Sequence, residues 1–145
     1  MAKTETSVIA DCPAEQVWKF ITDFGNYPKW DPVIVELKKT SAGPLGLGTT
    51  LEVRRKDKRT IPERVIEYEP NRKFTFVVTS GPAKGTKGTF SIENIEGKTR
   101  LTEAADWKFS GFYKLVGPFV AGNAKRESAA RVGNIKRVLE SEAQS

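Results

Sequence analysis

The stretch PFVAGNAKRESAARVGNIKRVLES, residues 118–141, decides the fold of this chain. Small or apolar residues recur in it at steps of three or four, which is the period of an α-helix. This stripe consists of Ala121, Ala124, Ser128, Val132, Ile135 and Leu139. Charged residues such as Lys125, Lys136 and Arg137 fall on the opposite side, so we expect an amphipathic helix that buries one face. Pro118 suits its first turn, and a helix of about 36 Å is long enough to cross a whole sheet.

The stripe changes in size along the helix, from small residues between Ala121 and Ser128 to large ones between Val132 and Leu139. Large side chains fill the space between a helix and a sheet. Small side chains either let the helix approach the sheet closely or leave a hollow. One interpretation is therefore that the first half of the helix roofs a ligand cavity. The other is that bulky residues of the sheet close the gap, as the packing density of protein interiors favours.

Upstream of this helix the apolar period changes to two, which is typical of β-strands. Strands are predicted to begin at Val33 and Leu51, and further strands to cover 60–68, 74–78, 88–92 and 101–109. In the first of them, Val33, Val35 and Leu37 are expected to share one face. In the last, the shared face carries Leu101, Glu103, Ala105, Trp107 and Phe109. Pro62 predicts an edge strand or a bulge.

The chain begins with a different pattern. Residues 4–10 alternate as a strand does, and apolar spacing then predicts a helix over 13–24, with Pro13 in its first turn and Asp11 or Cys12 as its cap. A short helical turn is expected over 26–31, before Pro32. The order is strand, two helices, six strands and a long helix, without β-α-β alternation. This order predicts an α+β fold with one antiparallel sheet of about seven strands, in a single domain over residues 1–145.

Composition excludes several classes of function. Hydrophobic residues make up 38% and charged residues 29% of the 145 positions, as in globular domains. There is no histidine, and the only cysteine is Cys12, so we expect no metal site, no Ser-His-Asp triad and no internal disulfide. No apolar run is long enough to span a membrane and no signal peptide is evident, so we expect a cytoplasmic protein. The net charge of +6 is spread among acidic residues, which favours a solvated surface over a nucleic-acid interface.

Five short motifs occur in order along the chain: ADCPAEQVW at 10–18, YPKWDP at 27–32, GPLGLGT at 43–49, EYEP at 67–70 and GKTRLT at 97–102. Together they resemble the polyketide cyclase/dehydrase branch of the START/Bet v 1-like superfamily. The resemblance covers about residues 6–140. It implies the helix-grip fold, in which a curved antiparallel sheet wraps around the C-terminal helix and encloses a cavity. It says less about function, because one fold can host several activities.

The strand alternation and the helix stripe together nominate ligand-binding residues. Aromatic walls are expected from Trp30, Phe76, Phe90 and Trp107, although for each residue taken singly plain core packing is the better explanation. The full set that we nominate is Trp30, Arg55, Phe76, Phe90, Glu103, Trp107, Ala124, Glu127, Ser128 and Arg131. Arg55 is expected at the cavity mouth, and the glycine-rich segment 41–48 is interpreted as a turn and a lid, because it lacks the Gly-Lys-Ser/Thr of a phosphate loop.

Glu103 is the most informative of these residues, because it takes an inward position between apolar neighbours. A buried carboxylate needs a partner, and its pKa tends to rise. It is therefore either a polar anchor or general base in the cavity, or it sits at the rim through a bulge and pairs with a lysine or arginine. Glu127 and Arg131 are spaced for an i,i+4 ion pair, and Arg131 is also able to hold an anionic group at the pocket mouth.

Three functions follow as hypotheses. The first is cofactor-free binding of a small hydrophobic ligand, such as a lipid, a polyketide or an aromatic metabolite, by a monomer or weak homodimer. The second is a cyclase/dehydratase that folds a poly-β-ketone and promotes aldol closure, with Glu103 or Tyr68 as candidate catalytic groups. The third and weakest is a protein-interaction module. The absence of histidine favours binding over catalysis.

Overall fold

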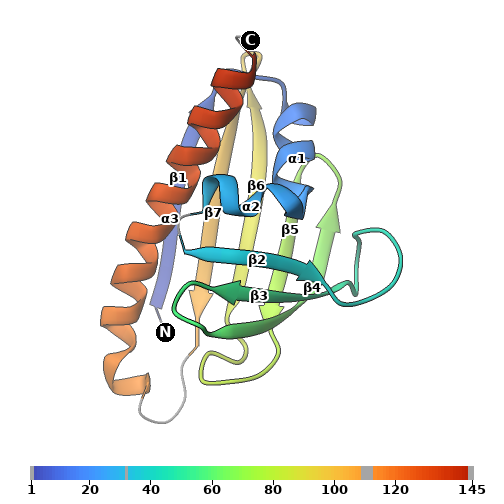
Figure 1. Ribbon diagram of the computed structural model, residues 1–145. Helices are drawn as coiled ribbons and strands as arrows, with labels where there is room; N and C mark the ends of the chain where they lie inside the picture. Colours follow the sequence, from blue (N-terminus) through green and yellow to red (C-terminus); the bar gives the residue numbers. More distant parts are fainter. Residues whose placement is uncertain (1, 32, 109–112, 144–145) are drawn as a thin grey trace.

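The computed structural model describes residues 2–31, 33–108 and 113–143 (Figure 1). Its strands are β1 Ala2–Ala10, β2 Ile34–Lys39, β3 Thr50–Arg55, β4 Thr60–Glu69, β5 Lys73–Val78, β6 Lys87–Ile95 and β7 Lys98–Trp107. Its helices are α1 Ala14–Thr22, the 3-10 helix η1 Phe24–Asn26, α2 Tyr27–Trp30 and α3 Tyr113–Ala143. The order β-α-α-β6-α and the α+β class are confirmed.

All seven strands form one antiparallel sheet in the order β1-β7-β6-β5-β4-β3-β2. The sheet is strongly curled, since β1, β7 and β6 stand upright in the view while β2 and β3 cross it (Figure 1). The long helix α3 lies along β1 and β7 at one side of the concave face, and α1 covers β6 and β7 at the upper end. The concave face is therefore shared between α3, α1 and α2, and this is the helix-grip arrangement.

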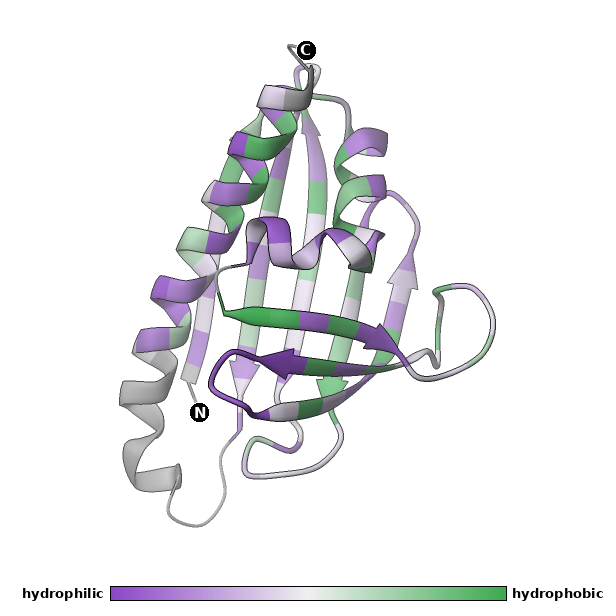
Figure 2. Cartoon of the chain, viewed as in Figure 1, coloured by the Kyte–Doolittle hydropathy of each residue, from purple (hydrophilic) through white to green (hydrophobic). Residues whose placement is uncertain are grey.

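The large half of the α3 stripe packs into the core, as predicted. Val132, Ile135 and Leu139 are almost fully buried, in one cluster with Ile21 of α1 and Leu101 of β7. The hydropathy colouring shows the same alternation, with apolar positions of upper α3 turned toward the strands and the first helix (Figure 2). This end of the domain is consequently solid.

Both helix starts differ from the prediction. Helix α3 begins at Tyr113, so Pro118 lies beyond its first turn and not in it; a proline at such a position removes one backbone hydrogen bond within the helix. Helix α1 has Pro13 as its N-cap residue, and no side chain caps it. Asp11 does not cap this helix; its backbone N–H donates to Glu140 Oε2 of α3 at 3.0 Å.

Two strand predictions were wrong because of backbone irregularities. A register shift between Ile34 and Glu36 places a bulge at Val35, so Ile34 and Leu37 are buried while Val35 is 42% exposed. Pro62 is not on an edge strand, since β4 lies between β3 and β5. The β4–β5 register begins at Glu63, one residue after the proline, so Pro62 needs no N–H there and its carbonyl accepts from Thr79 at 3.0 Å.

We predict that Ile135→Ala lowers the free energy of unfolding by about 2–5 kcal/mol, because Ile135 is fully buried and its truncation leaves a cavity. Urea denaturation followed by circular dichroism measures the change. The control is Val35→Ala, on the exposed side of the β2 bulge, which is expected to stay within about 0.5 kcal/mol of the parent. Equal losses in the two variants would contradict this account of the core.

Candidate functional site

A cavity of about 620 Å³ lies between the sheet and the part of α3 around Ala124 and Ser128. Its walls are largely apolar side chains of β2 to β6, among them Leu37, Leu51, Val53, Phe76, Val78 and Phe90. The small helix residues and the curl of the sheet leave this space unfilled. The described residues therefore favour the first interpretation of the stripe, a roof over a hollow.

The Phe76 wall depends on a glycine in the neighbouring strand. Phe76 of β5 pairs with Gly88 of β6, and a Cβ atom at Gly88 would lie 2.7 Å from the Phe76 ring. A side chain at position 88 would therefore collide with the ring, and the glycine allows the ring to approach the backbone of β6. Trp107, at the end of β7, is another aromatic wall, and its indole N–H donates to Thr4 Oγ1 of β1 at 3.1 Å.

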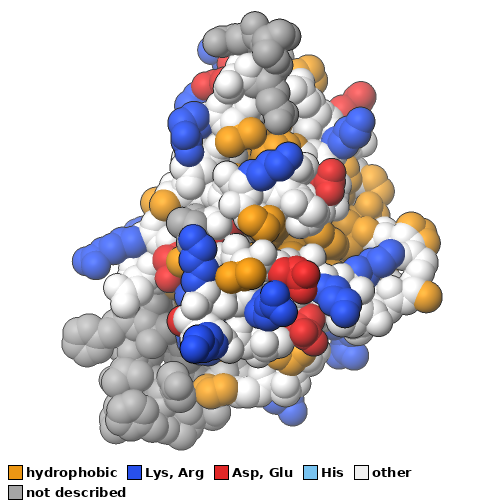
Figure 3. All heavy atoms as spheres, viewed as in Figure 1, with side chains coloured by type: hydrophobic (Ala, Val, Ile, Leu, Met, Phe, Trp, Pro, Cys, Tyr) orange, Lys and Arg blue, Asp and Glu red, His pale blue; other side chains and the backbone are white. Residues whose placement is uncertain are grey.

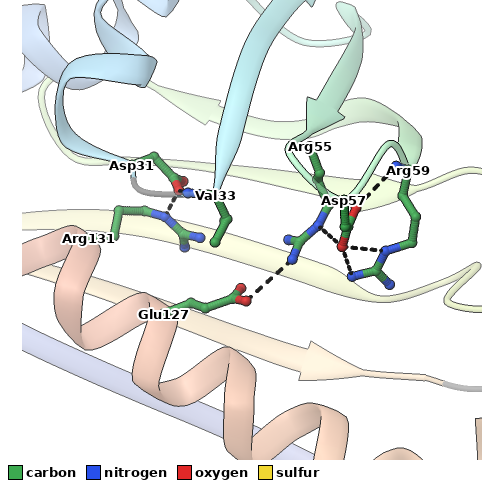
Figure 4. Close-up of polar contacts among 7 residues, drawn as sticks. All are labelled: Asp31, Val33, Arg55, Asp57, Arg59, Glu127 and Arg131. Carbon is green, nitrogen blue, oxygen red and sulfur yellow. Dashed lines mark hydrogen bonds and ion pairs between the residues drawn. The ribbon is translucent and has the colours of Figure 1, made fainter.

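A buried ion cluster forms the polar end of this cavity. Arg131 of α3 donates through Nε to Asp31 Oδ2 at 2.5 Å, and through Nη1 to Glu103 Oε1 of β7. Asp31 follows α2, and its Oδ1 accepts from the backbone N–H of Val33 at 3.0 Å; Figure 4 shows these contacts of Asp31. The Asp31 side chain is fully buried, and those of Arg131 and Glu103 are mostly buried. The cluster therefore connects α3, β7 and the end of α2 through one guanidinium that is largely removed from water.

The charges in this cluster control one another's protonation. Burial raises the pKa of Glu103, and the positive charge of Arg131 opposes that rise. Burial alone would lower the pKa of Arg131, but the charges of Glu103 and Asp31 outweigh burial and raise that pKa. Arg131 therefore stays charged. Tyr27 also lines the cavity, and burial raises its pKa well above the usual value, so it stays a neutral hydroxyl.

Glu63 is a further acid on the cavity wall, and the sequence did not lead us to nominate it. Burial raises its pKa to about 8; Arg131 opposes the rise and Glu103 adds to it. The described residues offer its carboxyl group no hydrogen bond or ion pair. A signal for it was present, because Ile61, Glu63 and Val65 alternate on one face of the strand.

Charged residues also cluster where the β3–β4 turn approaches α3, at the cavity mouth. Arg55 donates to Glu127 Oε1 of α3 at 3.3 Å and to Asp57 Oδ2 at 3.2 Å (Figure 4). Arg59 also bonds Asp57, at 2.8 Å, and hydrogen bonds from Arg59 hold the Asp57 pKa below its usual value. Outside the cavity, Lys and Arg side chains are scattered among acidic ones on the face shown in Figure 3.

The structure brings most of the nominated residues together. Nine of them line the cavity: Arg55, Phe76, Phe90, Glu103, Trp107, Ala124, Glu127, Ser128 and Arg131. Trp30 is buried behind the wall, with its ring centroid 4.2 Å from that of Tyr27 and 6.4 Å from that of Phe90. Tyr68 packs on Trp18 at 5.7 Å, away from the cavity. An inward-facing residue is thus not always a cavity residue.

Four further expectations are decided by the structure or fall outside the described part. Glu127 and Arg131 do not form an i,i+4 pair, because each finds a partner on another element. Glu103 reaches the cavity face without a bulge, since β7 pairs regularly with β1 and β6, and it pairs with an arginine nonetheless. Segment 41–48 contributes no cavity-lining residue; the loop around Ser80–Ala83 does. Phe109 and the side chain of Ala121 lie outside the described residues.

Within the described ranges, no three acidic or cysteine side chains are arranged to hold a metal ion. A search of those same ranges finds no helix that is long and apolar enough to cross a membrane. The site therefore consists of an apolar cavity, a buried ion cluster with one additional acid, and a charged mouth.

Comparison with protein families gives one match. The model of the family described as polyketide cyclase / dehydrase and lipid transport matches residues 1–140. No curated protein matches the sequence.

Solved structures resemble this one over nearly the whole chain. The ZhuI aromatase/cyclase of a Streptomyces species has a TM-score of 0.79 at 16% identity, with 96% of this chain and 93% of that chain covered. TTHA0849 of Thermus thermophilus has 0.80 at 13% identity, covering 99% and 100%. Ara h 8.0201 has 0.72 at 17%, covering 97% and 98%. At these identities the likeness shows the fold.

Arg131→Met is predicted to destabilise the protein by about 3–5 kcal/mol, because two buried carboxylates lose the charge that compensates them. The loss should shrink as pH falls, since burial raises the pKa of Glu103 and its protonation removes part of the uncompensated charge. Urea unfolding at several pH values measures both effects. Arg126→Met, at an exposed position of the same helix, is the control and should change stability by at most about 0.5 kcal/mol. A pH-independent loss in Arg131→Met would contradict the electrostatic explanation.

Proposed function

Because the chain belongs to the polyketide cyclase/dehydrase and lipid-transport family, we propose that it binds one small hydrophobic molecule in the cavity beneath α3. The observation that carries this proposal is the cavity itself, at about 620 Å³ with apolar walls and a few polar groups at one end. Ligand sites commonly have this size and lining. The proposal includes lipids, polyketides and aromatic metabolites.

The distribution of polar groups supports a ligand with an apolar body and one polar group. Phe76, Phe90 and Val53 offer surface for rings or an aliphatic chain, while Arg131, Glu103 and Glu63 lie at the polar end. A molecule held in this way moves its apolar surface out of water and onto these walls. Each Å² of apolar surface buried contributes roughly 25 cal/mol to the free energy of binding. Shape and apolar area would then supply affinity, and the polar end would fix orientation.

A second function, cofactor-free cyclisation of a poly-β-ketone, is favoured by one specific observation. Glu63 faces the cavity with a pKa raised to about 8, and a general acid or base works best when its pKa lies near the working pH. The cavity would fold the chain and bring reacting carbons together, which lowers the entropic cost of aldol closure. In this reading Glu63 takes the role first assigned to Glu103 and Tyr68, because Glu103 is held by Arg131 and Tyr68 lies outside the cavity.

Filling the cavity tests the binding function. Ala124→Leu places a larger side chain in the roof, so affinity for a neutral apolar dye, 2-(dimethylamino)naphthalene, should fall about tenfold, or about 1.4 kcal/mol. The matched control is Ala130→Leu, which makes the same change at an exposed position of the same helix and should leave affinity unchanged. Fluorescence titration gives the dissociation constants. Native mass spectrometry of gently purified protein should also show a co-purified ligand in the parent and in Ala130→Leu, and less of it in Ala124→Leu.

The binding function would be disproved if the dye bound neither the parent nor the control, or if all three proteins bound it equally. Added turnover of a model poly-β-ketone would support the second function, and binding without turnover would leave the first.

A further inference from the structure

Glu63 occupies a position in the sheet where a carboxyl group is unusual. It lies in β4, between Leu51 of β3 and Val78 of β5 in the strand register, and all three residues line the cavity. The structure gives its carboxyl group no hydrogen bond or ion pair among the described residues. Because this carboxyl group faces the cavity and no protein group bonds it, a molecule held in the cavity is the partner that it is placed to bond.

The surrounding charges decide the form in which Glu63 meets that partner. From α3 it faces Arg131, from β7 Glu103, and from α2 the hydroxyl of Tyr27. Arg131 is already bound by Asp31 and Glu103. The neighbours on β3 and β5 are uncharged. Three acids therefore lie near one guanidinium, and two of them bond it. Glu63 is the acid that makes no contact with it, and Glu63 retains its proton near neutral pH.

We propose that the protonated carboxyl group of Glu63 is the anchor of the cavity and donates a hydrogen bond to a carbonyl oxygen of the ligand. The ligand class is a neutral ketone with an aromatic or extended apolar body. This inference rests on the proposed binding function.

The surroundings of Glu63 favour a neutral ligand over a cationic amine. At the mouth, Arg55 and Arg59 are paired with Asp57 and Glu127, so the mouth gives a cation no net attraction. A bound amine would also require Glu63 to ionise beside Glu103, against the effect of burial. A ketone needs neither, and its oxygen accepts the one hydrogen bond that Glu63 offers.

A pair of dyes that differ in one carbonyl group tests the inference. Prodan, 6-propionyl-2-(dimethylamino)naphthalene, carries a ketone, and 2-(dimethylamino)naphthalene lacks it. We expect the parent protein to bind Prodan more tightly at pH 6.5 than at pH 9.5, by about tenfold or more, because Glu63 loses its proton between these values. Affinity for the dye without the ketone should barely change. Circular dichroism at both pH values confirms that the protein stays folded.

Two variants separate hydrogen bonding from charge. Glu63→Gln keeps a donor that does not titrate, so Prodan affinity should persist at both pH values and its pH dependence should disappear. Glu63→Leu removes the donor, so Prodan affinity should fall to that of the ketone-free dye, with loss of the red-shifted emission of a hydrogen-bonded carbonyl. Glu52→Gln is the control, since Glu52 is exposed on β3, and it should behave as the parent does.

Several results would overturn the inference. If the parent bound the two dyes with equal affinity, Glu63 would not bond the ligand carbonyl, although the binding function would stand. A pH dependence of Prodan binding that survived in Glu63→Gln would lead to the same conclusion. Stronger binding of Prodan at pH 9.5, if Glu63→Gln abolished it, would also overturn the inference, because an ionised carboxylate has no proton to donate to a carbonyl oxygen. Failure of both dyes to bind any of the proteins would overturn the binding function and this inference together.

Discussion

The contact of Arg131 with Asp31 and Glu103 is the constraint on which the site depends. A guanidinium removed from water is unfavourable unless carboxylates compensate it, and here they come from the end of α2 and from the middle of β7. The three groups hold α3 at a defined position relative to the sheet and the short helix. They also give the cavity a polar end, so one buried interaction fixes both the distance between the layers and the chemistry between them.

The change of residue size along α3 explains why the space beside that contact stays open. Val132, Ile135 and Leu139 reach across to α1 and the sheet and fill the upper half. In the other half, Ser128 instead closes onto β1, where its hydroxyl shares a 2.6 Å hydrogen bond with Thr6. Helix α3 is thus held near β1, and the hollow opens toward β3 to β6. The same stripe stabilises the fold at one end and leaves a pocket at the other.

What the sequence predicted well depended on repeating patterns. Alternation placed Glu103, Ala105 and Trp107 on the cavity face of β7, and the five ordered motifs identified the family. A pattern with a single irregularity failed, since the bulge in β2 exposes Val35 and buries Ile34 while Leu37 keeps its predicted side. Glu63 was missed because Pro62 interrupts the alternating pattern of that strand.

Pairings between distant elements were beyond the sequence. Glu127 is four residues from Arg131, yet it bonds Arg55 from another strand, because the layers meet where the fold brings them together. Trp30 was correctly expected to face inward, but whether an inward side chain fills the core or lines the hollow depends on the volume around it, which no local pattern records. Only the assembled structure supplies that volume.

The count of buried charges distinguishes this site from the fold that carries it. One scaffold hosts many functions, so the fold limits the ligand only to something apolar of suitable size. Two carboxylates on one arginine already leave the inner end with a negative balance. A third ionised acid on the same wall would add repulsion without a partner, and retaining the proton on Glu63 is the less costly state. The protonated Glu63 carboxyl group is then a hydrogen-bond donor within an apolar wall. A site of this kind selects by the position of an acceptor oxygen, and this selectivity arises from the imbalance of acids over bases in the cavity.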